Sequence, residues 1–209
     1  VLDAETRRNL ELTETLRDHK LDGSLLGVLD KTQTAGGKRM LRAWVNKPLL
    51  NIDAINKRLD LVAFFFKNGV LRQDLNAILS KLHDMERLVN RINSGSARPP
   101  DLVALREDFE AIPKLLALLK DKDPVLDHVL TKISSFDEER EHLQVAIEDE
   151  PPATLANIGI IRPGYSEALD EILNASKHAR EWINNLEGLE RQRTGIKNLR
   201  VGYNKVFGY

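Results

Sequence analysis

The longest uninterrupted periodic segment of this chain runs from Ser166 to Arg193. Apolar or small residues recur there at every third or fourth position and therefore share one face of a helix. They are Leu169, Ile172, Leu173, Ser176, Ala179, Ile183, Leu186 and Leu189. At 1.5 Å per residue such a helix is about 40 Å long, which exceeds the width of a small domain. We therefore expect it to act as a strut rather than to sit inside one compact core.

The same helical period governs most of the remaining sequence and predicts an all-α (mostly) fold class with a multi-helix core. Asp53 and Asp101 are expected to cap the N-termini of two helices, and Gly69 is expected to end one. Pro113 is a candidate position for a kink or division. The predicted helices cover residues 24–30, 35–46, 53–66, 70–82, 84–92, 101–119, 124–133 and 138–146.

Two segments favour β structure instead. The apolar run at 158–161 lies between proline-rich and glycine-rich breaks and predicts a short β segment near residues 158–162. After Thr194 and Gly195 the period changes from helical to alternating, which predicts a terminal strand near residues 198–208. Because a lone strand has no partner for its backbone groups, we expect the chain to be a piece of a longer protein.

Composition narrows the functions that are open to the chain. Lys and Arg number 31 and Asp and Glu number 32, so the formal net charge is −1. The chain as a whole therefore lacks the basic character that is usual in a self-sufficient nucleic-acid-binding domain. The absence of cysteine excludes disulfides, cysteine nucleophiles and thiolate zinc sites. No apolar run approaches the roughly 20 residues that are needed to span a bilayer.

The sequence contains no pattern that predicts catalysis. Gly36-Gly37-Lys38 resembles a phosphate-binding loop only in part, because it lacks the upstream glycine and does not follow an apolar strand. No two of the five histidines have the spacing of a zinc-binding helix pair. His83 precedes the acidic Asp84, but adjacent side chains do not face each other on a helix. We expect no catalytic, cofactor-binding or metal-binding residues in this chain.

The end of the sequence is modestly basic. Lys197, Arg200 and Lys205 follow the long periodic segment and are candidates for contacts with a DNA backbone. Lysine and arginine contacts to phosphates dominate nonspecific affinity for nucleic acid. The alternative interpretation is an ordinary run of solvent-exposed surface charges.

Several stretches match one known family in the expected order along the chain. The most specific are Glu-Arg-Gln-Arg-Thr-Gly-Ile at residues 190–196 and Val-Gly-Tyr-Asn-Lys-Val-Phe-Gly-Tyr at residues 201–209. The others lie at residues 2–12, 23–32, 34–44, 48–49, 84–92, 97–102, 161–165 and 169–170. Together they resemble the MutS family of DNA mismatch repair proteins, and the bacterial branch of it more than the eukaryotic one.

The resemblance implies a helical core at residues 1–165, a lever helix at 166–195 and the first strand of a truncated DNA clamp at 196–209. The parent protein would be a cytoplasmic homodimer that binds mismatched duplex DNA, hydrolyses ATP with Mg and signals to a MutL-type repair protein, with no membrane association. The nucleotide site would lie outside this chain, so the fragment is expected to hold no cofactor and not to be an enzyme. Its function would be to couple the ATPase domain to the DNA clamp.

Seven residues of the matching stretches are expected to have structural or coupling roles. Arginines such as Arg39 and Arg42 can clamp carbonyls or carboxylates, and Thr194 with Gly195 marks where the lever helix must end. The full set is Arg39, Arg42, Trp44, Arg87, Arg91, Thr194 and Gly195. The alternative function is a stand-alone helical scaffold that binds a protein partner through a leucine-rich face. The strand-like end of the sequence discriminates the two, because a scaffold has no need of an unpaired strand.

Overall fold

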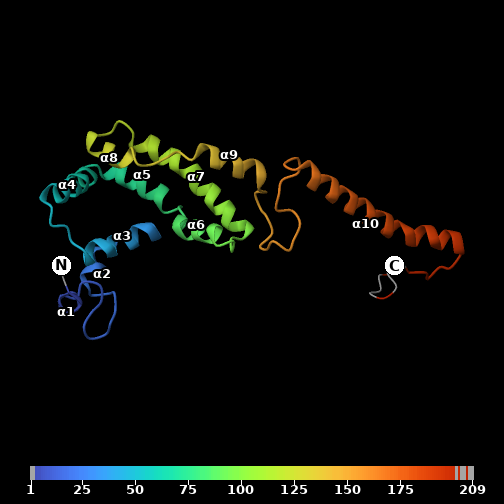
Figure 1. The fold of residues 1–209 in the computed structure, drawn as a ribbon, viewed down its shortest axis with the longest axis horizontal. Helices are drawn as coiled ribbons and strands as arrows, with labels where there is room; N and C mark the ends of the chain where they lie inside the picture. The colour runs from blue at the N-terminus through green and yellow to red at the C-terminus, as the bar shows by residue number, and fades with distance from the viewer. Residues whose placement is uncertain (1–2, 201, 203–205, 207–209) are drawn as a thin grey trace. The chain divides into compact units, whose positions relative to one another are not determined.

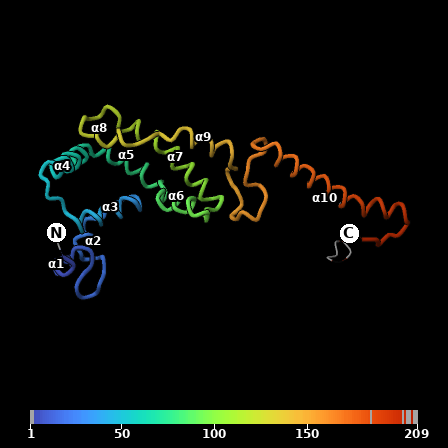
Figure 2. The backbone as a smooth tube through the Cα atoms, viewed as in Figure 1, coloured from blue at the N-terminus to red at the C-terminus, as the bar shows by residue number. Residues whose placement is uncertain are grey.

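The computed structural model of the chain describes residues 3–200, 202 and 206, apart from the side chain at position 184. These residues are predominantly helical, which confirms the predicted all-α fold class (Figure 1). The chain divides into two compact units, Val1–Ile160 and Ile161–Tyr209. The backbone trace shows the succession of helices in the first unit and the single long helix of the second (Figure 2).

The first unit contains short helices at its start and longer helices around one core. Three of the longer helices, α3, α4 and α6, begin at a polar side chain that accepts a backbone N–H, as Thr34 does for Gly37 at 3.0 Å. In chain order the helices are α1 (Ala4–Asn9), α2 (Leu25–Leu29), α3 (Ala35–Asn46), α4 (Ile52–Lys67), α5 (Gly69–Leu79), α6 (Met85–Asn93), α7 (Pro99–Leu119), the 3₁₀ turn η1 (Pro124–Leu126), α8 (Asp127–Leu130) and α9 (Asp137–Ala146).

Three of the predicted helix boundaries were wrong. Asn51, not Asp53, caps α4, because its side chain accepts the N–H of Ala54 at 2.8 Å. Gly69 begins α5 rather than ending α4. Asp101 lies inside the first turn of α7, where its carboxylate accepts the backbone N–H of Arg98. Helix boundaries predicted from single-residue preferences commonly differ by one or two residues from those of the structure.

Helix α7 organises the core of the first unit. It runs through Pro113 without a break and contacts α5, α6 and α9 (Figure 1). Its buried residues Leu105, Phe109 and Ile112 follow the helical period and pack against Leu88 of α6. The ring of Phe109 stacks on Phe136 with centroids 5.0 Å apart. The core is therefore built from one face of α7, as the apolar periodicity of this segment predicts.

The β segment expected near residues 158–162 does not form a strand. Gly159 has a φ of +90°, which interrupts an extended conformation. One strand-like bond remains, from the backbone N–H of Glu148 to the carbonyl of Ile160 at 3.0 Å. Most of the terminal strand expected near residues 198–208 lies outside the described residues, and residues 197–198 form a turn.

The second unit is dominated by α10 (Glu167–Thr194), the long helix that the sequence predicts. The Ser166 hydroxyl accepts the N–H of Leu169, and Gly195 ends the helix in the left-handed conformation with φ 75°. Apolar side chains of α10 remain exposed, including Ile172 at 67% and Trp182 at 62%. Within the described residues of this unit, α10 therefore has no apolar core of its own.

Candidate functional site

The N-terminal half of α3 meets the start of α6 in an ion-pair cluster. The guanidinium of Arg39 donates to both carboxylate oxygens of Asp84, at 2.8 and 2.7 Å, and also pairs with Glu86 at 2.6 Å. Asp84 caps α6 as well, because it accepts the backbone N–H of Arg87 at 3.3 Å. The hydrogen bonds from Arg39 lower the pKa of Asp84, and the same bonds raise the pKa of Arg39. One bidentate arginine of α3 thus ties that helix to the N-terminus of α6.

A second cluster joins α6 to α7. Arg91 donates to Oδ1 of Asp101 at 2.5 Å, while Oδ2 of the same carboxylate accepts the backbone N–H of Arg98 at 2.9 Å. Asp101 is buried, and burial by itself raises its pKa. The bond from the Arg98 N–H and the positive charge of Arg91 outweigh this effect, so the pKa is lowered overall. The carboxylate is therefore ionised and holds the turn between the two helices.

Two buried charged residues of α7 extend the network, and sequence reasoning missed both. Arg106 is 5% exposed and donates to the carbonyl of Ile147 at 3.0 Å and to Asp149 at 2.9 Å. Asp108 is 1% exposed, and its Oδ1 accepts the backbone N–H of His83 at 2.9 Å. No hydrogen-bond partner of its Oδ2 is found among the residues that the structure describes. In the sequence, both residues flank the apolar stripe of Leu105, Phe109 and Ile112, and this position was the only indication that they are buried.

The side chain of His83 contacts α7 and not the acidic residues next to it in sequence. Its ring Nδ1 lies 3.0 Å from Oδ1 of Asp108, and its Nε2 lies 3.8 Å from Glu107. The acidic residues that lie beside the His83 ring are therefore Glu107 and Asp108 of α7, and not Asp84, which follows it in the sequence. These contacts fix the segment between α5 and α6 against α7.

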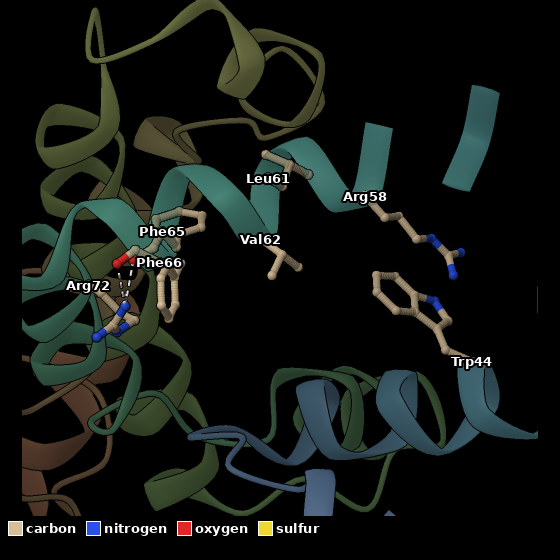
Figure 3. A pocket seen from close by; sticks show the side chains of 7 residues that line it. All are labelled: Trp44, Arg58, Leu61, Val62, Phe65, Phe66 and Arg72. Atoms are coloured by element: carbon tan, nitrogen blue, oxygen red, sulfur yellow. Dashed lines mark hydrogen bonds between the residues drawn. The ribbon is translucent and has the colours of Figure 1, made fainter. Parts of the chain in front are cut away.

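An exposed apolar groove lies between α3 and α4. Arg58 is placed over the ring of Trp44, 3.6 Å from its centroid. Arg72 donates to the carbonyl of Phe65 at 2.6 Å and so caps the end of α4. Figure 3 shows Trp44 with Arg58 at one end of the groove and Arg72 near the other. Its volume is about 360 Å³, and it is lined by Trp44, Arg58, Leu61, Val62, Phe65, Phe66 and Arg72.

The other residues singled out from the sequence are placed on the surface. Arg42 and Arg87 are exposed, and no ion pair of either is found within the described part of the chain. Arg87 still helps to lower the pKa of Asp84, after the larger effect of the hydrogen bonds from Arg39. Lys197 and Arg200 are exposed beyond α10, and Lys205 lies outside the described residues.

The end of α10 is defined by local contacts. The Thr194 hydroxyl donates to the carbonyl of Glu190 at 2.6 Å, and the N–H of Gly195 donates to the carbonyl of Arg191 at 2.9 Å. The side chain of Arg191 also reaches forward, where its Nε donates to the carbonyl of Leu199 at 2.8 Å. Thr194 and Gly195 thus lie where the helix gives way to a turn.

These contacts define a class of protein: a helical domain in which arginine–carboxylate pairs fasten helices to one another. Among residues 3–200, 202 and 206, no group of three or more histidine and acidic side chains is arranged to hold a metal ion. In the same residues, every helix is too short or too polar to span a bilayer.

The chain belongs to the MutS domain III family, whose model matches residues 5–200. It is 46% identical to the DNA mismatch repair protein MutS of Alkaliphilus oremlandii, over the whole chain and 24% of that protein. Over the same shares it is 43% identical to the MutS of Symbiobacterium thermophilum and 44% identical to that of Thermosynechococcus vestitus. The chain thus spans about a quarter of the length of these relatives. The matches do not favour a stand-alone scaffold.

Proposed function

We propose that this chain is the connecting part of a bacterial mismatch repair protein, and that it transmits conformational change between an ATPase domain and a DNA clamp. Its relatives are named DNA mismatch repair proteins and are about four times as long. The nucleotide site, with ATP and Mg, would then belong to other parts of the whole protein. The proposed regions are the core at 1–165, the lever at 166–195 and the start of the clamp at 196–209.

The observation that carries this proposal is the fastening of helix ends by Arg39 and Arg91. Each arginine bonds a carboxylate at the start of another helix, and that carboxylate also accepts a backbone N–H there: Arg39 of α3 reaches the start of α6, and Arg91 of α6 reaches the start of α7. A displacement of one helix is thereby passed to its neighbour instead of being absorbed by a loop. Helix α10, with 28 residues, adds a rod of roughly 42 Å at 1.5 Å per residue.

The partners of the whole protein follow from the same proposal. They are mismatched duplex DNA, a second copy of the whole protein and a MutL-type repair protein, in the bacterial cytoplasm beside the nucleoid. Lys197, Arg200 and Lys205 stay candidates for the DNA backbone, because cationic side chains that follow the lever would lie at the start of the clamp. Arg42, Trp44 and Arg87 stay candidates for coupling.

A chimeric protein tests the proposal. The segment of Alkaliphilus oremlandii MutS that matches this chain is replaced by the chain itself, and the chimera is expressed in a strain that lacks MutS. We expect the mutation rate to fall to the repair-proficient level. In the purified chimera, Arg39→Ala should preserve the rate of ATP hydrolysis measured without DNA. It should reduce the change in that rate that mismatched DNA causes by about fivefold or more, the lower end of typical allosteric couplings.

Arg140→Ala is the matched control. Arg140 pairs with Asp137 at 3.1 Å within α9, so its loss removes an ion pair without releasing another helix. The response of ATP hydrolysis to mismatched DNA should stay within about twofold of the unmodified chimera, because exposed pairs contribute little. Equal losses in the two variants would contradict a coupling role for the junction of α3 and α6.

A further inference from the structure

The turn that follows α10 is held by a side chain of the helix itself. Arg191 lies one turn before the end of α10, and its Nε donates to the carbonyl of Leu199, eight residues further along the chain. Its Nη2 pairs with Glu187 on the same helix, which orients the guanidinium. The backbone carbonyl of Arg191 accepts the N–H of Gly195. Arg191 therefore contacts the exit of the helix through both its side chain and its backbone.

The other bonds of this turn are longer. The N–H of Leu199 donates to the carbonyl of Ile196 at 3.3 Å, and the N–H of Ile196 donates to the Thr194 hydroxyl at 3.4 Å. The bond from Arg191 to Leu199 is 2.8 Å and its donor is charged, which makes it the strongest of the three. After a left-handed glycine, the direction of the chain depends on such bonds, because the helix no longer constrains the backbone.

We propose that Arg191 is a positioning residue that fixes the direction in which the chain leaves α10. It thereby sets the place of Lys197 and Arg200 relative to the helix, although it does not itself contact DNA. The inference rests on the proposed function, in which these two side chains meet a DNA backbone. Both are exposed beyond the helix end and belong to the short segment that Arg191 holds.

Arg193 supplies a matched control on the same helix. It pairs with Glu190 at 2.8 Å, as Arg191 pairs with Glu187, and its side chain is 75% exposed. Its Nε is bonded to Glu190 and not to the turn. Replacing either arginine with alanine removes the same charge and one intrahelical ion pair. The difference between the two variants isolates the bond to Leu199.

The contribution of Arg191 to the stability of the turn is measured first, without DNA. Amide hydrogen exchange at Leu199 is followed in the 209-residue chain and in its Arg191→Ala, Arg191→Lys and Arg193→Ala variants. Arg191→Ala and Arg191→Lys should speed exchange about fivefold or more, because a lysine cannot bond Glu187 and Leu199 in the same planar arrangement. Arg193→Ala should change it by less than about twofold, as expected for an exposed ion pair. Unchanged exchange in both Arg191 variants overturns the inference.

Binding of duplex DNA by the chimera then separates positioning from direct contact. Arg191→Ala and Arg191→Lys should both weaken affinity by about fivefold, and Arg193→Ala by less than about twofold, if only the first two release the turn. Restored affinity in Arg191→Lys would show a direct phosphate contact, which needs only a positive charge, and would overturn the inference.

A different measurement shows whether the proposed contact of Lys197 and Arg200 with DNA is wrong. A chimera that carries both Lys197→Ala and Arg200→Ala should bind DNA more weakly and with a smaller dependence on salt. Undiminished binding by that variant contradicts the proposed DNA contact of these residues. The exchange rate at Leu199 is measured without DNA and still decides whether Arg191 holds the turn.

Discussion

The core around α7 and the long helix α10 are stabilised by different kinds of contact. Leu105, Phe109 and Ile112 of α7 are buried against other helices, and Arg106 bonds a carbonyl 41 residues away. The bonds described above for α10 are local: a serine cap, ion pairs three or four residues apart and a terminal glycine. The stability of a packed core is sensitive to substitution of single interior residues. The stability of a long exposed helix depends instead on its caps and on the ion pairs along its surface.

This difference predicts a large asymmetry between core and rod. Phe109→Ala should lower the free energy of unfolding by about 3–5 kcal/mol, because it leaves a cavity beside Phe136. Ile172→Ala on α10 should change it by less than about 1 kcal/mol, because the isoleucine is 67% exposed. Urea unfolding followed by circular dichroism measures both.

Fluorescence of Trp44 in a Trp182→Phe background reports the first unit separately, because the chain has only these two tryptophans. The midpoint of this signal should shift in Phe109→Ala and stay unchanged in Ile172→Ala. Equal shifts in the two variants would mean that α10 is not locally stabilised, and the contrast between the regions would be lost.

The sequence predicted the helix bodies better than the contacts between them. Residues 35–46 were predicted as a helix with the bounds that the structure gives to α3, because periodicity and the Thr34 cap are local signals. Arg39 was singled out, yet its partner Asp84 lies 45 residues away and caps a different helix. Such pairs depend on tertiary packing, which a single sequence does not contain.

Buried charges were the larger omission. Arg106 and Asp108 are polar residues that ordinarily lie on the solvent-facing side of an amphipathic helix. Here α7 is surrounded by α5, α6 and α9, so part of its polar face is also enclosed. The number of helices that would cover α7 was not visible in its own periodicity.

The ion pair between α3 and α6 should contribute to the free energy of unfolding of the first unit, and this contribution should be lost in acid. We expect it to be smaller than the effect of Phe109→Ala and larger than the effects at the glycines of α10. The pKa of Asp84 is lowered by its hydrogen bonds with Arg39, so the folded state favours the ionised form. This contribution is complete above the ordinary aspartate pKa of about 3.9 and is lost as the pH falls through the lowered value. Asp84→Asn removes the charge but can still cap α6, since asparagine is a good N-cap residue.

The stability of the chain and of Asp84→Asn is compared by urea unfolding from about pH 7 to about pH 2. The free energy of unfolding of the unmodified chain should exceed that of Asp84→Asn by a constant amount near neutral pH. This difference should shrink below about pH 4. Asp137→Asn, which affects an exposed pair within α9, serves as the control and should show little advantage at neutral pH. An advantage of the unmodified chain that grows as the pH falls would contradict the assigned sign.

The smallest predicted effects compare two glycines of the rod. Gly195 ends α10 with φ 75°, where a Cβ costs about 1 kcal/mol, so Gly195→Ala should fray the last turn. Gly188 lies inside the helix with open space where a Cβ would be added, so Gly188→Ala should stabilise it by about 0.5–1 kcal/mol. Amide exchange along α10 should quicken near its end in the first variant and slow near position 188 in the second. Effects of the same sign would mean that the helix is not limited by its own backbone preferences, and that contacts from elsewhere decide where it ends.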